Sequence, residues 1–341
     1  MTHLVEMQEA HDKLERAGMK LYAISYDDVD ALAAFAEAQS IDYTMLSDAN
    51  SEVIRSLGIL NTNVAPHEVP FYGIPFPGTY VIDEDGRVVA KFFPRHITLR
   101  ESVETFIDAA AGKITIADDE PQQVADDHDD VRVSVAFHGG DALRTGLQRR
   151  IVARFDLPEG VHIYGEPVPD GMVATTVDVS GPDGLVVEAP ILPPTEPFEI
   201  KGMGAKLDVW SGVVDIVVPV WAESKLAPFS VPDGETPTAT IDVRVRYQAC
   251  DDYACRLPRT ETFTFEIPIA SGTTPRLSAF RGNPNSTTMS STKHLSRMVR
   301  RSLLKRPWLA LRSFRYLLSQ RRHLDAAADR PTPDRPAPDG Q

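Results

Sequence analysis

Apolar and polar positions in the first 116 residues alternate between a helical and a strand-like spacing. Strands are predicted at residues 20–26 and 41–48 and in both halves of 78–93, and helices at 29–40, 51–58 and 99–111. The apolar run at 20–26 indicates a buried strand. The two halves of 78–93 meet at Asp85-Gly86, a dipeptide typical of tight hairpin turns. Strands that alternate with helices predict a layered α/β domain over residues 1–116.

From residue 131 to residue 270 the helical spacing disappears, and short stretches of alternating apolar and polar residues replace it. Pro-Glu-Gly and Pro-Asp-Gly triplets separate these stretches at intervals typical of a β-sandwich. The strands predicted in this way cover residues 131–137, 149–157, 173–180, 213–222, 238–247 and 262–269. The pattern therefore predicts a second, all-β domain over residues 131–270.

Two segments lack a pattern that would build a core. Residues 117–130 are acidic and almost without apolar side chains, which is typical of a linker. Residues 271–341 begin and end in polar, Pro-containing stretches that predict a flexible tail. Within this tail two basic amphipathic helices are predicted, HLSRMVRRSLL and a second that starts at Pro307. The apolar face of the second would be formed by Trp308, Leu311, Phe314 and Leu318.

Charge is unevenly distributed along the chain. The formal net charge is -14, which argues against a nucleic-acid-binding protein. The stretch from Lys293 to Arg322 nevertheless carries ten Lys and Arg residues and no Asp or Glu. This basic tail would fit against an anionic membrane surface or against the acidic remainder of the chain, and a solvated helix is an equally good interpretation.

The chain shows no apolar run long enough to span a membrane and no basic segment followed by an apolar one at its start. We therefore expect a cytoplasmic protein. His138, His162 and His294 lie on separate segments, so we expect surface or hydrogen-bonded histidines rather than a metal site. No cofactor is predicted.

The two cysteines of the chain, Cys250 and Cys255, lie in the stretch YQACDDYACRLP between two predicted strands. Two cysteines that flank such a loop can come close enough for a disulfide. A ring this short gives little entropic stabilisation, so a purely structural role is poorly supported. Asp251 and Asp252 should disfavour a thiolate, which suits a pair that is attacked by a partner. The residues alone leave three interpretations open: an exchangeable dithiol, a passive disulfide or two buried thiols, and a zinc site.

Several stretches of the first domain resemble the redoxin family of alkyl hydroperoxide reductase and thiol-specific antioxidant proteins. They are HLVEMQEAHDKLERAGMKLYAISYD, FAEAQSIDYTMLSD, SEVIRSLGI and GIPFPGTYVIDEDGRVV. The resemblance implies a thioredoxin-like fold. It also implies a cis peptide bond before Pro77, because a cis proline precedes this strand beside the reactive thiol in that family.

The first domain departs from the redoxin family at the point that matters for catalysis. The family's reactive cysteine precedes its first helix, but residues 1–249 of this chain contain no cysteine, and the family's first strand is missing as well. A domain without a thiolate lacks the nucleophile for a peroxide or a disulfide. We expect an N-terminally truncated redoxin; a catalytically inactive remnant is the other interpretation.

The second domain resembles the N-terminal periplasmic domain of the thiol:disulfide interchange protein DsbD, an immunoglobulin-like β-sandwich. The stretches that carry the resemblance are VWSGVVDIVVPVWAES and TIDVRVRYQACDDYACRLPRTETFTFEIPI. The matching positions of its redox site are Tyr247, Gln248, Cys250, Cys255 and Pro258. The loop aromatic that covers the cysteines in that family is not matched here, where only Met203 is available.

Together the two resemblances imply a redoxin-family antioxidant or thiol–disulfide oxidoreductase in which Cys250 and Cys255 form an exchangeable dithiol. The expected partner is a thioredoxin-like or other thiol–disulfide protein. The competing hypothesis is a catalytically inactive redoxin that serves as a scaffold or interaction module, with structural cysteines.

Overall fold

The computed structural model describes residues 2–65, 72–94, 99–125, 131–199, 206–228, 230–232, 234–251 and 253–272, with residues 296, 300 and 304. The chain divides into two compact units, residues 1–20 with 77–274 and residues 21–76 with 275–341. Strands predominate over helices in the described residues. The predicted tail helix that starts at Pro307 lies outside them, and residues 296, 300 and 304 of the helix predicted before it are helical. No helix within the described residues combines the length and apolar content of a membrane span.

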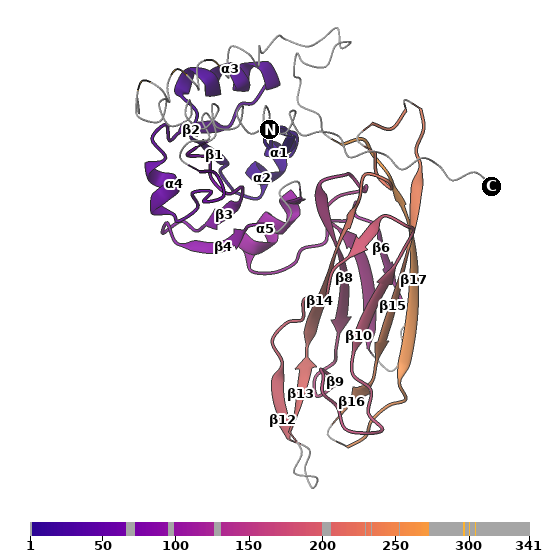
Figure 1. Cartoon of the computed structure of the whole chain (residues 1–341). Helices are drawn as coiled ribbons and strands as arrows, with labels where there is room; N and C mark the ends of the chain where they lie inside the picture. Colours follow the sequence, from indigo (N-terminus) through magenta and orange to yellow (C-terminus); the bar gives the residue numbers. More distant parts are fainter. Residues whose placement is uncertain are drawn as a thin grey trace, which may run out of the picture. The chain divides into compact units, whose positions relative to one another are not determined.

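The described residues of 21–76 form two parallel strands and two helices (Figure 1). The elements are β1 (Tyr22–Ser25), α3 (Val29–Gln39), β2 (Thr44–Ser47) and α4 (Glu52–Ser56). β1 and β2 pair in parallel, as strands connected by a helix do. The prediction that the first strand is buried is wrong, since Tyr22 is 58% and Ile24 36% exposed. Among the described residues β1 pairs with β2 alone, so its alternate side chains lack the cover of a wider sheet.

The remaining elements of the predicted first domain belong to the other compact unit. They are α1 (Thr2–Glu9), α2 (His11–Arg16), β3 (Thr79–Ile82), β4 (Val88–Phe92), β5 (Arg100–Glu101) and α5 (Val103–Ala111). The hairpin predicted at Asp85-Gly86 is confirmed: β3 and β4 are antiparallel, and Gly86 has a φ of 79°, which favours glycine. The Phe106 ring of α5 packs 5.3 Å from the Phe92 ring of β4.

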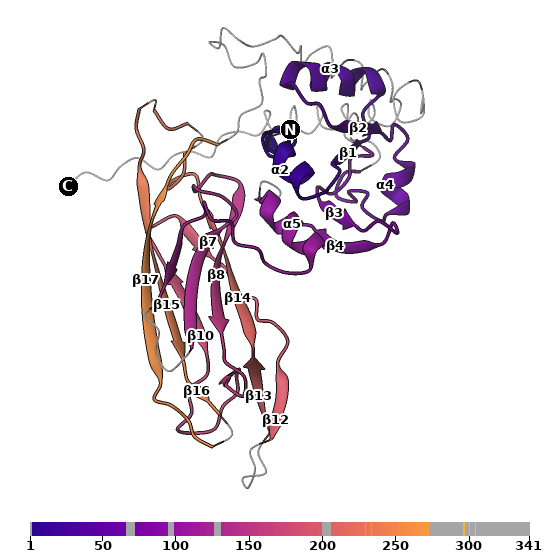
Figure 2. The same ribbon diagram turned by 180° about the vertical axis from the view of Figure 1, so that it is seen from behind.

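All six strands predicted in the second domain are confirmed, and shorter strands accompany them (Figures 1 and 2). The strands are β6 (Gln122–Val124), β7 (Arg132–His138), β8 (Leu147–Asp156), β9 (His162–Tyr164), β10 (Thr176–Ser180), β11 (Leu185–Val187), β12 (Glu196–Glu199), β13 (Lys206–Ser211), β14 (Val213–Ala222), β15 (Thr238–Tyr247), β16 (Ala249–Cys250) and β17 (Arg259–Pro268). One sheet has the order β11-β14-β8-β7-β6, with β5 added beside β8, and a second has the order β10-β15-β17. A third sheet, β12-β13-β9-β16, carries the first cysteine.

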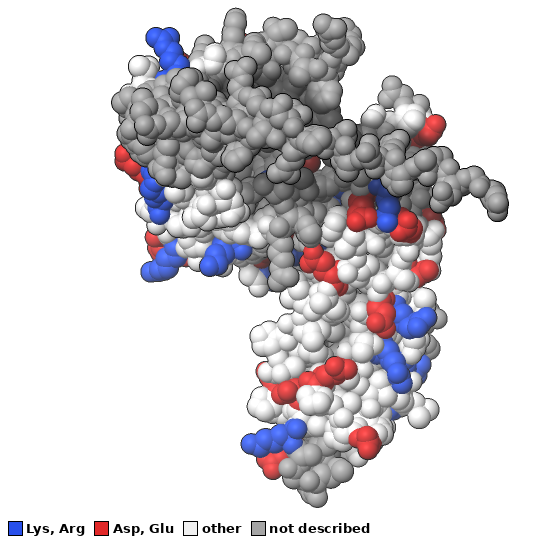
Figure 3. All heavy atoms as spheres, in the orientation of Figure 1, with Lys and Arg blue, Asp and Glu red and all other residues white. Residues whose placement is uncertain are grey.

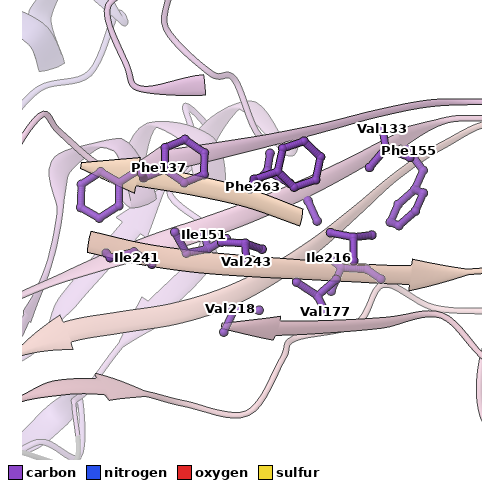
Figure 4. Packing of buried hydrophobic residues seen from close by; sticks show 14 of the residues in the cluster. Val133, Phe137, Ile151, Phe155, Val177, Ile216, Val218, Ile241, Val243 and Phe263 are labelled. Carbon is purple, nitrogen blue, oxygen red and sulfur yellow. The ribbon is translucent and has the colours of Figure 1, made fainter. Parts of the chain in front are cut away.

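Two of these sheets enclose the hydrophobic core. Inward side chains of β7, β8 and β14 meet those of β10, β15 and β17 (Figure 4). The alternation in β15 is complete, because every second residue from Ala239 to Tyr247 is buried and the residues between them are exposed. This period of two places one face of each strand in the core. The polar faces remain outside, where acidic and basic side chains are interspersed among uncharged ones (Figure 3).

The segment predicted as an acidic linker is partly a strand. Residues 122–124 form β6, which pairs with β7, and Gln123 Nε2 donates a hydrogen bond to the Thr264 carbonyl at 2.6 Å. Glu120, which precedes β6, is only 5% exposed. The acidic composition of residues 117–130 gave no sign of β6. The Glu120 carboxylate can be buried there because partners that are distant in the sequence neutralise its charge.

Candidate functional site

Cys250 and Cys255 lie at the two sides of a tight turn between β15 and β17. The Asp251 backbone N–H donates to the Ala254 carbonyl at 3.0 Å, and the Arg256 N–H donates to the Ala249 carbonyl at 2.9 Å. The Asp251 carboxylate accepts hydrogen bonds from the N–H groups of Tyr253 and Ala254, and these lower the pKa of its carboxyl group. Asp251 therefore fixes the turn and keeps a negative charge on the residue next to Cys250.

The two cysteines are joined by a disulfide, with their Cα atoms 4.1 Å apart. Their environments differ. Cys250 is 1% exposed and packs with Tyr164, Leu207 and Val209, whereas Cys255 is exposed. The sequence left open the interpretation that the cysteines are two buried thiols. The disulfide excludes that interpretation for this structure. The disulfide presents one sulfur to solvent and buries the other.

A neighbouring strand positions a tyrosine hydroxyl at the exposed sulfur. β9 pairs with β16 so that His162 lies opposite Cys250. Two residues along β9, the Tyr164 hydroxyl lies 3.5 Å from Cys255 Sγ. The Tyr164 ring is 2% exposed and packs edge-to-face on His162, with ring centroids 5.3 Å apart. Sequence reasoning missed Tyr164, because 91 residues separate it from Cys255 and only the strand pairing brings them together.

Two large apolar side chains flank the exposed sulfur in sequence. Tyr253 in the turn is 97% exposed, and Leu257, two residues beyond Cys255, is 86% exposed. Single exposed apolar residues are common on protein surfaces. Tyr253 and Leu257 stand on either side of Cys255 in the sequence, and we call this pair the Tyr253–Leu257 flank.

The predicted supporting residues Tyr247 and Gln248 hold the segment in place. Tyr247 is 3% exposed and packs on the Phe155 ring at 5.5 Å, so it belongs to the core. The Gln248 side chain accepts a hydrogen bond from the Val173 N–H at 2.9 Å and donates one to the Arg256 carbonyl at 3.0 Å. Gln248 therefore ties both sides of the cysteine turn to the loop before β10. Neither side chain has a described contact with the sulfurs.

The expectation for Pro77 is not met, and the expectation for Met203 is not tested. The cis peptide bond of the described residues is Glu166–Pro167, so the expected cis bond before Pro77 is not found. Pro77 precedes β3, where the Phe93 ring closely covers Gly78. Met203 lies outside the described residues.

A second cluster of buried ionisable groups lies in the same compact unit, around His138 on β7. His138 is 1% exposed, and both ring nitrogens face carboxylates, with Nε2 2.8 Å from Asp108 Oδ2 and Nδ1 2.6 Å from Glu120 Oε2. Arg150 Nη2 donates to the same Asp108 oxygen at 2.5 Å. The prediction that His138 is a hydrogen-bonded histidine is confirmed. We call these four residues the His138 cluster.

The cluster favours the charged form of each of its three titrating members. Burial alone lowers the pKa of His138, but the hydrogen bonds to Asp108 and Glu120 outweigh it and leave the pKa raised. Burial raises the pKa of Asp108 and of Glu120, yet the hydrogen bonds from His138 leave both pKa values lowered. The His138 ring, whose charged form is favoured, therefore links β7 to α5 and to the segment before β6. Because both ring nitrogens of His138 are already engaged, its imidazole has no free nitrogen for a metal.

Comparison with protein families confirms both resemblances. The model of the AhpC/TSA family matches residues 1–91, and the model described as thiol:disulfide interchange protein DsbD, N-terminal, matches residues 131–267. Both cysteines fall within the second match. The first match contains none, in agreement with the sequence.

Curated relatives of the first part are peroxiredoxins. A putative peroxiredoxin of Mycobacterium tuberculosis is 36% identical over 77 residues, which are 21% of this chain and 45% of that protein. Peroxiredoxin Bcp of Escherichia coli is 29% identical over 86 residues, 24% of this chain and 51% of that protein. Chloroplastic peroxiredoxin Q of Gentiana triflora is 32% identical over 81 residues, 24% of this chain and 34% of that protein. The chain thus spans about half or less of the length of these relatives.

Solved structures similar to this chain include two N-terminal domains. The reduced N-terminal domain of DsbD from Neisseria meningitidis is 16% identical with a TM-score of 0.25, and the similarity covers 40% of this chain and 85% of that one. The N-terminal periplasmic domain of ScsB from Proteus mirabilis is 14% identical with a TM-score of 0.28, over 43% of this chain and 50% of that one.

Proposed function

We propose that this chain, with its AhpC/TSA-family segment and its DsbD N-terminal domain, exchanges disulfides with a thioredoxin-like protein through Cys250 and Cys255. The observation that carries the proposal is the unequal exposure of the two bonded sulfurs, with Cys255 open to solvent and Cys250 1% exposed. Thiol–disulfide exchange needs an accessible sulfur for the incoming thiolate. A short ring also adds little stability, so a structural role explains the bond less well.

The geometry favours Cys255 as the sulfur that the partner attacks. A partner thiolate forms a bond to Cys255 Sγ, and Cys250 Sγ leaves with the electron pair of the broken disulfide and takes up a proton. The partner's second thiolate then attacks the partner sulfur of the mixed disulfide and releases Cys255. Two electrons pass from the partner dithiol, which becomes a disulfide, to this pair, which becomes two thiols. The reverse sequence would reduce an oxidised partner.

The redoxin-like part takes no part in the proposed thiol–disulfide exchange. Residues 1–249 contain no cysteine, so this part cannot supply a thiolate, and no residue of the chain is assigned a peroxidase step. The same observation favours the second candidate function, a scaffold with a structural disulfide. The domain boundaries and the cytoplasmic location stay predictions.

A redox titration of the full chain separates the two candidates. The protein is equilibrated with glutathione or dithiothreitol couples, and the fraction of alkylated cysteine is counted by mass spectrometry. An exchangeable pair should titrate with a reduction potential above about -300 mV, in the range of redox-active disulfides. A potential below that value, or a Cys250–Cys255 disulfide that stays unreduced by reduced thioredoxin, would support the scaffold.

Removing the Tyr253–Leu257 flank should impair exchange with a protein partner while sparing exchange with a small dithiol. In the variant Tyr253→Ser with Leu257→Ser, we expect reduction by thioredoxin to slow by about tenfold, because the apolar contacts beside the sulfur are lost. Reduction by dithiothreitol should change little, because that molecule needs only the exposed sulfur. Stopped-flow or quenched alkylation measures both rates.

The matched control for the flank is Val124→Ser, which removes another exposed apolar side chain, 48% exposed, from β6. It should leave both rates unchanged. Equal slowing of thioredoxin and dithiothreitol in the flank variant would contradict a docking role for the flank.

A further inference from the structure

The hydroxyl of Tyr164 is the one side-chain donor that the described contacts place at the exposed sulfur, 3.5 Å from Cys255 Sγ. In the disulfide neither sulfur carries a hydrogen, so the tyrosine O–H is the donor of this contact. Burial raises the pKa of Tyr164, which keeps the hydroxyl protonated over the range in which thiols titrate.

The position of this hydroxyl is set by strands on both sides. β9 lies between β13 and β16, and Tyr164 pairs with Val209 of β13. The Tyr164 carbonyl also accepts the Thr175 N–H at 2.8 Å. The ring is 2% exposed in a cluster that includes Cys250. The ring therefore has little freedom to turn away when the disulfide opens.

We propose that Tyr164 is a positioning residue whose hydroxyl stabilises the thiolate of Cys255. This inference rests on the proposed exchange reaction. In its second step the partner's thiolate attacks the partner sulfur, the bond from that sulfur to Cys255 breaks, and Cys255 Sγ departs with the electron pair. The Tyr164 O–H points at the atom on which this negative charge develops. A hydrogen bond to a charged acceptor is stronger than one to a neutral acceptor, so it favours the thiolate over the bound sulfur.

The same contact separates the roles of the two cysteines. Cys250 Sγ lies among apolar side chains of β9 and β13, where a charge is disfavoured, so this cysteine is the one that takes up a proton. Cys255 has both solvent and the tyrosine hydroxyl. In the reverse reaction the reduced protein attacks a partner disulfide with the stabilised Cys255 thiolate, and Cys250 resolves the mixed disulfide. Tyr164 offsets part of the unfavourable effect of the Asp251 carboxylate on this thiolate.

The test uses the full chain with Cys250→Ser, in which Cys255 is the sole thiol, and measures its alkylation by iodoacetamide between pH 6 and 10. Adding Tyr164→Phe deletes the hydroxyl and keeps the ring. We expect the midpoint of the pH–rate profile to rise by about one pH unit, and the rate below the midpoint to fall by about tenfold. The matched control Tyr22→Phe deletes a hydroxyl on β1 and should leave the profile unchanged.

An unchanged midpoint in Tyr164→Phe would overturn the inference. A purely structural role for Tyr164 would alter thermal stability without moving the midpoint, so a melting curve of the same variant distinguishes the two roles. The experiment needs no protein partner. Failure of the wild-type chain to react with thioredoxin would overturn the proposed function and leave the alkylation result to decide the role of Tyr164.

Discussion

Replacing Cys250 with serine should turn the chain into a species that retains its redox partner as a mixed disulfide. Cys255 is exposed, so it can still react with an activated partner cysteine, but the buried sulfur that would resolve the product is absent. In Cys255→Ser the remaining thiol, Cys250, is 1% exposed and should react at least about tenfold more slowly. The expected difference between the two single-cysteine chains is the largest effect that the site geometry predicts.

The measurement uses thioredoxin that retains one active-site cysteine, activated as its mixed disulfide with thionitrobenzoate. Release of thionitrobenzoate gives the rate, and a non-reducing gel shows the covalent complex. The chain with both cysteines replaced by serine controls for non-covalent association. Equal rates for the two single-cysteine chains would show that burial does not assign the roles and would contradict attack at Cys255.

The second large effect is expected at the His138 cluster, in stability rather than in redox activity. His138→Gln removes the imidazole ring from between Asp108 and Glu120, which leaves Glu120 without its charged partner and Asp108 with Arg150 alone. Loss of one member of a buried ion pair typically lowers the free energy of unfolding by about 3–5 kcal/mol. We expect a loss of this order near pH 6, measured by urea unfolding. Amide hydrogen exchange in α5 and β7 should increase at the same time.

The His138 cluster should also make the free energy of unfolding of the wild-type protein depend on pH. The pKa of His138 is raised by folding, so its contribution is complete below the ordinary histidine value of about 6.5 and is lost as pH rises through the folded value. The pKa values of Asp108 and Glu120 are lowered, so their contributions are lost as pH falls below their ordinary values of about 3.9 and 4.3. Stability should be greatest between these limits.

In His138→Gln the decline on the alkaline side should disappear, because no imidazolium remains to lose its proton. The control is His11→Gln, which removes a histidine 3.9 Å from Glu15 on α2, a surface pair of small expected energy. A wild-type curve that stays flat from pH 6 to 9 would contradict the proposed charge state of the cluster.

The β-sandwich could be predicted from local patterns because the alternation of apolar and polar residues that marks a strand is visible within a few residues. The alternation from Thr238 to Tyr247 places every second side chain in the core, whatever the strand pairs with. The burial of the strand at residues 20–26 could not be predicted in the same way. An apolar run shows only that its residues favour a strand. The exposure of Tyr22 depends instead on which other parts of the protein lie beside that strand.

Burial could not be predicted from local pattern in the polar segment 117–130 either. Their composition is typical of a linker, but Glu120 is buried because His138 and the N–H of Gly139 satisfy its oxygens. A charged residue is buried only when its partners are present, and those partners come from β7 and the turn after it. No local pattern around Glu120 contains that information.

The sequence by itself determined that any disulfide within this chain joins Cys250 to Cys255, since no other cysteine exists, and that a short turn between two strands separates them. Only the tertiary structure decided which sulfur is exposed and which residue lies beside it. β9 contributes Tyr164 and covers Cys250 through pairing with β16, from a position more than 80 residues away in the chain. Apolar periodicity acts between near neighbours, whereas exposure and hydrogen bonding depend on strand order and register, which long-range packing selects.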